Sequence, residues 1–276
     1  MIQIDSHQHF WQFDPVRDAW IDESMEVLRR DFLPEDLAPI LKKHQLAGCI
    51  AVQADQSEAE TNFLLDLAAK HSFIKGVVGW LDLRADNIEE RLALFCENSD
   101  LKGLRHIAQA EPVDFLLRPD FQNGIKYLAP FGLSYDLLVF QHQLPAAIEL
   151  VRQFPEQAFV LDHLAKPPYS EGMNTLWKQQ IQTLASFPNV WCKISGMVTE
   201  TKGFEWTKND FLPFLEELLE TFGPKRLMYG SDWPVCLLAA DYQQQMEIVK
   251  TFISALSENE QAQIMGLNAI DFYRLQ

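Results

Sequence analysis

Short apolar runs recur along the chain, and each is followed by a polar connection and then by a segment with helical periodicity. The runs are rich in β-branched and aromatic residues, and they read IQID, GCIAVQ, GVVGWLDL, GLRHI, SYDLLVF, AFVLD, VWCKI and LMYG. Runs of this length and composition, bounded by turn residues, are typical of buried β-strands. The pattern therefore predicts eight strands that alternate with helices.

The segments between these runs place apolar residues three and four positions apart, as an amphipathic helix does. Two of them, LPEDL and QLPAA, carry a proline near the first turn, which favours a helix start. The predicted helices span residues 34–44, 59–71, 88–96, 144–154, 176–186, 211–222, 242–256 and 258–273.

Eight strand–helix units of about 30 residues predict a (β/α)₈ TIM barrel, a fold that commonly takes about 250 residues as one domain. The chain has 276 residues and no glycine- or serine-rich linker, charge block or repeat, so we expect a single domain over residues 1–276. A doubly wound open sheet is the alternative, but no Gly-x-Gly-x-x-Gly motif follows any predicted strand.

The charge balance restricts the class of partner. The net charge of −16 argues against nucleic acid and against an anionic membrane surface, because both need a basic face. We expect no signal peptide and no membrane span, since no run approaches about 18 apolar residues. The expected partner is a small molecule, and a homo-oligomer is possible.

The four cysteines form no Cys-x-x-Cys pair, and three of them lie in apolar runs. We therefore expect buried free thiols in a reducing compartment, with the cytoplasm as the location.

Polar residues gather where the predicted strands end, and in a barrel of this kind the chemistry lies at those ends. His7 and His9 are two residues apart on the first strand, so both side chains point to one face. The residues at the other ends are Gln53, Trp80, Asp82, Arg105, His106, His142, Asp162, His163, Lys166, Lys193, Ser195, Ser231, Asp232 and Trp233. Five of the seven histidines belong to this set, whereas His44 and His71 fall at helix ends.

Several of these residues also have a structural interpretation. His163 can cap a strand end, Asp232 in GSDWP can be a turn residue, and Arg105 can pair with a carboxylate such as Asp82. Lys193 can belong to a structural ion pair, and Asp162 can anchor a neighbouring group. Four residues can serve in packing or point away from the mouth of the barrel: Trp80, His106, Phe10 and Trp11.

The motifs DSHQHFWQFDP, GVVGWLDL, AEPVDFLLRPDF, YDLLVFQHQLPAA, LDHLAKPP, CKISGMVTE and YGSDWPVC span nearly the whole chain. Together they resemble the amidohydrolase superfamily, and within it the amidohydrolase-related group that contains L-fuconolactonase-like sugar lactonases. The superfamily consists of (β/α)₈-barrel hydrolases, which agrees with the strand count.

The resemblance implies that His7 and His9 are the strand-1 pair, His163 the strand-6 histidine and Asp232 the strand-8 aspartate. The lysine or glutamate that bridges two metals in binuclear members has no counterpart in GLRHI, where Arg105 stands, and His142 does not align securely with the strand-5 histidine. The implied cofactor is therefore none, or one divalent ion such as Zn²⁺ held by His7, His9, His163 and Asp232.

The function that follows is hydrolysis of a small sugar lactone, similar to L-fucono- or L-rhamnono-lactone, to its aldonic acid. Asp232 is the expected general base, and His7, His9, His163 and Arg105 are expected to stabilise the carbonyl oxygen. The residues expected to bind the sugar are Gln53, Trp80, Asp82, His106, His142, Phe10 and Trp11. A metal-dependent decarboxylase and a non-catalytic sugar-binding barrel are the alternatives.

Overall fold

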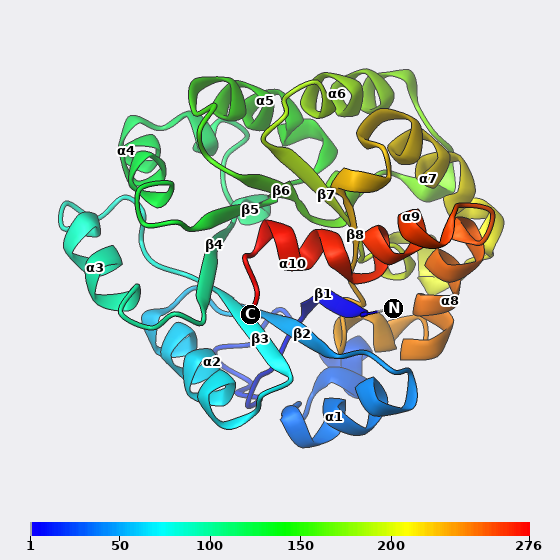
Figure 1. Ribbon diagram of the computed structural model, residues 1–276, viewed down its shortest axis with the longest axis horizontal. Coiled ribbons are helices and arrows are strands. Elements are labelled where there is room, and N and C mark those ends of the chain that lie inside the picture. Colours follow the sequence, from blue (N-terminus) through cyan, green and yellow to red (C-terminus); the bar gives the residue numbers. More distant parts are fainter. Residues whose placement is uncertain (1) are drawn as a thin grey trace.

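Eight parallel strands, each hydrogen-bonded to the next in sequence order, form the barrel that the pattern predicts (Figure 1). The computed structural model describes residues 2–276. The strands are β1 (Ile4–Gln8), β2 (Gly48–Val52), β3 (Ile74–Gly79), β4 (Leu101–Ile107), β5 (Ser134–Leu138), β6 (Phe159–Leu161), β7 (Val190–Ile194) and β8 (Leu227–Tyr229). The fold class is therefore confirmed as a (β/α)₈ barrel.

Helices follow the strands and surround the barrel, as Figure 1 shows. They are α1 (Pro34–Lys43), α2 (Glu58–Lys70), α3 (Ile88–Phe95), α4 (Pro119–Leu128), α5 (Leu144–Gln153), α6 (Thr175–Ala185), α7 (Lys208–Phe222), α8 (Tyr242–Ile253), α9 (Glu258–Ala262) and α10 (Asn268–Phe272). The sequence pattern did not predict α4, in which Gly124 weakens the helical signal. The helix predicted at 258–273 is divided by a π-helix, Gln263–Leu267.

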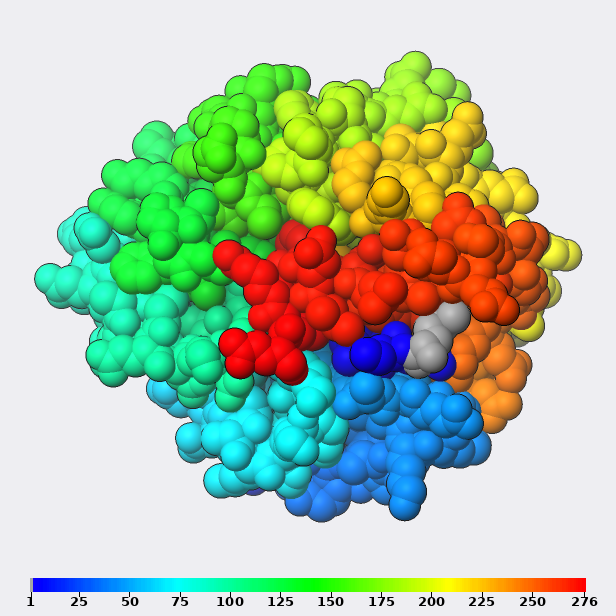
Figure 2. Space-filling view, in the orientation of Figure 1, coloured from blue at the N-terminus to red at the C-terminus, as the bar shows by residue number. Residues whose placement is uncertain are grey.

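The C-terminal segment closes one end of the barrel. In Figure 1 α9 and α10 lie across the centre of the barrel, and Figure 2 shows this segment covering the middle of the same face. Phe272 and Tyr273 pack there against Ile4, Val160 and other apolar residues from the starts and interior of the strands. Because this floor is closed, a ligand reaches the barrel from the opposite end, where the strands terminate.

The seam between β1 and β8 brings the first and last strands of the barrel together. The His9 amide donates to the Trp233 carbonyl oxygen at 2.7 Å, and the Asp232 amide donates to the His7 carbonyl oxygen at 2.8 Å. The buried Asp5 carboxylate adds a side-chain link, since it accepts from the Ser231 amide at 2.9 Å and from the Tyr242 hydroxyl of α8 at 2.9 Å. These bonds hold His7 of β1 and His9, which follows it, beside Asp232.

Other sequence predictions are also tested by the fold. All four cysteines are free, and three of them are buried, as expected. His44 and His71 follow the last residues of α1 and α2, which confirms their helix-end positions. Within residues 2–276, none of the helices has both the length and the apolar character that a bilayer crossing requires.

Candidate active site

Three histidines and an aspartate at the ends of β1, β6 and β8 converge at the open end of the barrel. The Nε2 atoms of His7 and His9 are 3.2 Å apart. Asp232 Oδ1 lies 3.4 Å from His9 Nε2, 3.7 Å from His7 Nε2 and 4.0 Å from His163 Nε2. All four residues are buried, with at most 5% of their surface exposed. The structure thus brings together the four residues that the motifs single out.

A left-handed backbone turn carries His163 to this position. The four residues His163, Leu164, Ala165 and Lys166 have φ angles of 53°, 57°, 58° and 49°. For non-glycine residues this conformation costs roughly 1–2 kcal/mol each. Hydrogen bonds support the turn, from the Lys166 amide to the His163 carbonyl oxygen at 2.7 Å and from Trp177 Nε1 to the Leu164 carbonyl oxygen at 3.0 Å. Asp232 also has a positive φ, 57°, so strained backbone positions two of the four residues.

Gly196, which follows β7, makes room for the His163 ring. A Cβ atom at this position would lie 2.4 Å from His163 Nδ1, and the φ angle of 62° is itself in the left-handed region. Only glycine satisfies both conditions. The neighbouring Ser195 hydroxyl lies 2.9 Å from His163 Nδ1 and orients the ring.

A buried network of charged residues lies next to the histidines of the site. Arg105 Nη1 donates to Asp162 at 3.2 Å, and Lys193 Nζ lies 3.0 Å from the other oxygen of Asp162. Lys193 also pairs with Asp136, which accepts a hydrogen bond from the Tyr273 hydroxyl at 3.0 Å. Arg105 therefore pairs with Asp162 and not with Asp82, and Lys193 belongs to the ion pair that its structural interpretation predicted.

The partners of His7 and His9 hold both rings in place. Lys193 Nζ lies 3.2 Å from His7 Nδ1, Arg105 Nη1 lies 3.3 Å from His7 Nε2, and the Asp162 carboxylate lies 3.4 Å from His7 Nδ1. His9 Nδ1 is 2.7 Å from the Val52 carbonyl oxygen and must donate to it. The Nε2 atom of His9 is thereby turned toward His7 Nε2, 3.2 Å away.

Burial and nearby charges lower the pKa values of His7, His163 and Asp232. Burial lowers the pKa of His163 to about 4, although the Asp232 and Asp162 carboxylates oppose it. Burial likewise lowers the pKa of His7 well below its usual value. Burial would raise the pKa of Asp232, but His163, His9 and His7 outweigh it and hold the pKa below its ordinary value. At neutral pH an ionised carboxylate therefore faces the neutral imidazoles of His7 and His163.

The converging residues form the end of a cavity of about 580 Å³. Its polar lining comes from His9, Arg105, Gln109, His163, Lys166, Thr199, Glu200 and Asp232. The rest of the wall is largely apolar and includes Trp11, Trp20, Met25, Ala54, Ile107, Ala110, Leu138, Phe204, Val235 and Leu238. A cavity of this size, with a few convergent polar groups, suits a small molecule.

Several residues expected to bind a sugar lie elsewhere. Trp80 Nε1 donates to His106 Nδ1 at 3.1 Å, and the other nitrogen of His106 lies 3.0 Å from Glu111, so both side chains turn away from the cavity. Asp82 pairs with Arg84 near the surface. His142 is exposed, and Phe10 is packed in the core against Trp233.

Of the other two residues expected to bind the sugar, Gln53 contacts a residue that lines the cavity, and Trp11 lines the cavity itself. Gln53 is fully buried, and its Oε1 accepts from Arg105 Nη2 at 2.8 Å, so it orients Arg105. Trp11 is 2% exposed, and it lines the cavity as expected. The structure therefore replaces the expected pair of Arg105 and Asp82 by two other pairs. Asp82 pairs with Arg84, and Arg105 pairs with Asp162.

The sequence interpretation missed most of the cavity wall. Trp20 and Met25 come from the long segment between β1 and α1, and Glu200 and Phe204 come from the segment after β7. These residues lie in irregular connections, where periodicity carries no signal. The motifs LDHLAKPP and CKISGMVTE contain Lys166 and Glu200, and they were the available signal for these two residues.

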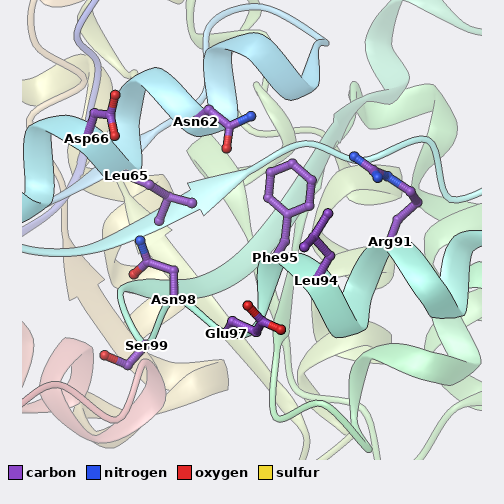
Figure 3. Close-up of a pocket in the computed structure, with 9 residues that line it drawn as sticks. All are labelled: Asn62, Leu65, Asp66, Arg91, Leu94, Phe95, Glu97, Asn98 and Ser99. Carbon is purple, nitrogen blue, oxygen red and sulfur yellow. The ribbon is translucent and has the colours of Figure 1, made fainter.

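A second cavity, of about 630 Å³, lies outside the barrel mouth between α2 and α3 (Figure 3). Leu65 and Phe95 contribute apolar surface, and Asp66, Arg91 and Glu97 are among its charged residues. The residues that converge on Asp232 do not line it. The chemistry of the protein therefore belongs to the cavity at the strand ends.

The donor set at the strand ends fits one metal ion. His7, His9 and Asp232 offer ligand atoms 3.2 to 3.7 Å apart, close to the spacing of about 3.3 Å between ligands of a tetrahedral zinc ion. The bond from His9 Nδ1 to the Val52 carbonyl oxygen is the support that metal-bound histidines commonly have. At His7 both the Asp162 carboxylate, at 3.4 Å, and the Lys193 ammonium, at 3.2 Å, face the Nδ1 atom.

The barrel and its three histidines and aspartate define a hydrolase-type site at the strand ends, and comparison with known proteins assigns the class. The protein belongs to the amidohydrolase family, whose model ("Amidohydrolase") matches residues 4–275. The chain is 39% identical to L-fucono-1,5-lactonase of Burkholderia multivorans over 99% of its length and 96% of that protein. It is 23% identical to L-rhamnono-gamma-lactonase of Scheffersomyces stipitis over 75% of its length and 70% of that protein.

Solved structures agree with this assignment. A crystal structure of an amidohydrolase from Burkholderia multivorans with bound zinc superposes with a TM-score of 0.95 at 40% identity, and covers 100% of both chains. A crystal form of the amidohydrolase from the same species with bound HEPES gives the same TM-score at 39% identity. The similarity therefore covers the entire barrel and its rim.

Proposed function

We propose that the protein is a carboxylic ester hydrolase that opens a neutral sugar lactone, such as L-fucono-1,5-lactone, to the aldonic acid. The observation that carries this proposal is the Asp232 carboxylate, ionised and within 4.0 Å of three imidazoles, at the end of a cavity of small-molecule size. The 39% identity to a lactonase over nearly the whole chain supports the choice of reaction.

Asp232 acts as the general base in this proposal. It accepts a proton from a water molecule as the water oxygen forms a bond to the lactone carbonyl carbon. When the tetrahedral intermediate collapses, the bond between this carbon and the ring oxygen breaks, and Asp232 returns the proton to that oxygen. The products are a hydroxyl group and a carboxylic acid, which ionises in water. The new carboxylate then lies beside the ionised Asp232, and their repulsion favours release of the product.

Positive charge from Arg105 and a proton on His163 support the developing negative charge of the carbonyl oxygen. Arg105 lines the cavity, but its Nε, Nη1 and Nη2 atoms already contact Gln53 and Asp162. We propose that it acts through its fixed positive charge. If the Ser195 hydroxyl donates to His163 Nδ1, then Nε2–H of His163 points toward Asp232 and is available to the substrate.

The cavity suits a neutral substrate that has both hydroxyl groups and an apolar part. Arg105 is paired with Asp162, and Lys166 with Glu200, so no unpaired cation lines the cavity among residues 2–276 to receive a dicarboxylate. Ile107, Leu138 and Val235 offer an apolar surface for the methyl group of a deoxy sugar.

One divalent ion, held by His7, His9 and Asp232 with His163 nearby, would polarise the carbonyl oxygen as a Lewis acid when bound. The positive charges of Arg105 and Lys193 lie 3.3 Å and 3.2 Å from the nitrogen atoms of His7 and oppose a further cation. We therefore predict at most one ion per chain, removable by a chelator, with activity largely retained. Metal analysis of the purified protein before and after chelation, alongside the rate, checks this, and two ions per chain would contradict it.

A panel of aldonolactones, assayed with a pH indicator with and without a chelator, tests the proposed function. We expect turnover of a neutral deoxy-sugar lactone by the wild-type protein. Faster turnover of a pyrone dicarboxylate lactone than of any aldonolactone would overturn the substrate assignment. The decarboxylase alternative predicts release of carbon dioxide and complete loss of activity on chelation, and the decarboxylases among the structural relatives share only 13% and 15% identity with this chain.

A further inference from the structure

Lys166, the last residue of the left-handed turn that positions His163, pairs with Glu200 at the cavity mouth. The pair joins the connection after β6 to the connection after β7. Lys166 Nζ lies 2.8 Å from Glu200 Oε1, and the side chains are only 22% and 23% exposed. Both residues line the cavity that contains Asp232. Gly196 contacts His163, and Glu200, four residues later, contacts Lys166, so the connections after β6 and β7 meet at two successive points.

Hydrogen-bonding capacity distinguishes Lys166 from the other cations near the site. Lys193 is fully buried among Asp136, Asp162 and His7, and Arg105 is occupied by Gln53 and Asp162. Across the described residues 2–276, the ammonium of Lys166 has one ion-pair partner, Glu200, and otherwise lies 5.6 Å from the centre of the Phe140 ring.

The Lys166–Glu200 pair therefore retains N–H donors and carboxylate acceptor positions that can bind a ligand. An ammonium group has three N–H donors, and a carboxylate has several acceptor positions, of which the ion pair uses only part. Apart from Gln109 and Thr199, the remainder of the wall beyond the Asp232 end is apolar. A polyhydroxylated ring in this cavity would find its charged hydrogen-bonding partners at Lys166 and Glu200.

We propose that Lys166 and Glu200 form a specificity pair that binds adjacent hydroxyl groups of the substrate, away from the carbonyl carbon. Lys166 donates to one hydroxyl oxygen, and Glu200 accepts from the neighbouring hydroxyl. The ion pair holds both groups in place before the substrate binds, and the left-handed turn links their position to that of His163. This inference rests on the proposed lactonase function and adds the residues that select a hydroxylated lactone over a plain one.

The test compares two lactones with each variant. L-fucono-1,5-lactone carries ring hydroxyl groups, and δ-valerolactone has none. The measured quantity is the ratio of kcat/KM for the first lactone to kcat/KM for the second, which does not depend on the fraction of folded enzyme. Loss of a charged hydrogen bond to the substrate predicts that Lys166→Met lowers this ratio on the order of 10- to 100-fold. Glu200→Gln, which keeps the shape, should lower it in the same direction.

Lys178→Met is the matched control, because Lys178 pairs with Glu217 on α7, outside the cavity. It should leave the ratio unchanged. If Lys166→Met and Glu200→Gln reduce the turnover of both lactones equally, or of neither, the specificity pair is wrong, although the lactonase function stands. If the wild-type protein hydrolyses neither lactone, the proposed function itself fails.

Discussion

The two sides of the barrel rim carry similar residue types but use them differently. On the side of β6, β8 and β1, the residues His163, Asp232, His7 and His9 converge within 4.0 Å of one Asp232 oxygen. On the side of β3 to β5, Trp80, Asp82, His106 and His142 pair with their own neighbours or face solvent. The difference shows that a polar residue at a strand end becomes part of the site only when the backbone turns it inward.

Strained backbone provides that inward turn for two of the four converging residues, His163 and Asp232. Asp232 and the four residues His163 to Lys166 all have positive φ angles, whereas none of the four unused residues does. Such conformations persist only where packing and hydrogen bonds enforce them.

Asp232→Asn is expected to have the largest effect. The amide keeps the shape of the side chain but cannot accept a proton, so kcat for the lactone should fall by about 10²–10⁴-fold. The folded structure should be retained, as measured by circular dichroism. Asp82→Asn, on the other side of the rim, is the matched control, because the Asp82 carboxylate pairs with Arg84 near the surface and does not line the cavity. A wild-type rate for Asp232→Asn would show that Asp232 is not the general base.

Arg105→Met should lower the stability of the fold in addition to removing the positive charge that supports the carbonyl oxygen. The substitution removes one partner of a buried ion pair, which generally costs about 3–5 kcal/mol, and Lys193 still neutralises part of the Asp162 charge. We therefore expect a loss near the lower end, about 3 kcal/mol, in chemical denaturation. Arg84→Met, which breaks a half-exposed pair on the other side, should cost less than about 1 kcal/mol. Equal losses for the two variants would contradict the comparison.

Gly196→Ala tests the backbone that positions His163. The added Cβ would meet His163 Nδ1 at 2.4 Å and must displace the ring. A displacement of about 1 Å can reduce a rate on the order of 10²-fold, so we expect kcat to fall 10- to 100-fold. Gly203→Ala is the control, because Gly203 has a similar φ of 66° but no atom within 4 Å of the added carbon. If both variants lose the same activity, the effect comes from backbone strain and not from the collision with His163.

His106→Gln should have the smallest effect on activity. The His106 ring stacks on Phe115 and accepts a hydrogen bond from Trp80, and it turns away from the cavity. We expect kcat/KM to stay within about threefold of the wild-type value, while the free energy of unfolding falls by about 1–2 kcal/mol through the lost hydrogen bonds. A loss of activity as large as that of Asp232→Asn would place His106 in the site.

The sequence was sufficient to predict the barrel and the side of the rim that converges. The alternation of apolar runs and amphipathic segments corresponds to β1–β8 and most of the helices. Two-residue periodicity placed His7 and His9 on one face, and closure of the barrel placed Asp232 beside them. These inferences work because regular elements have a fixed geometry that the residue pattern reports.

The irregular connections could not be predicted in the same way. Trp80 and Asp82 lie beyond the last residue of β3, Gly79, so strand periodicity does not orient them. His106 follows Arg105 on β4, and one of two adjacent strand residues must point outward. The left-handed run from His163 to Lys166 opposes the local preference of each residue and exists only because tertiary contacts enforce it. Lys166 and Glu200 lie in the irregular connections after β6 and β7, so strand periodicity does not predict their contact.

In the proposed mechanism Asp232 activates water for attack on the lactone carbonyl carbon, and labelled water follows that oxygen atom into the product. A single turnover of L-fucono-1,5-lactone, with enzyme in excess and in water enriched in heavy oxygen, should place one labelled oxygen in the carboxylate of the product, as mass spectrometry would detect. The rate should exceed that of the uncatalysed reaction in the same water. An unlabelled carboxylate would show that Asp232 attacks the carbonyl itself, and label in the hydroxyl group would show that the ring opens at the wrong bond. Either result would contradict the account.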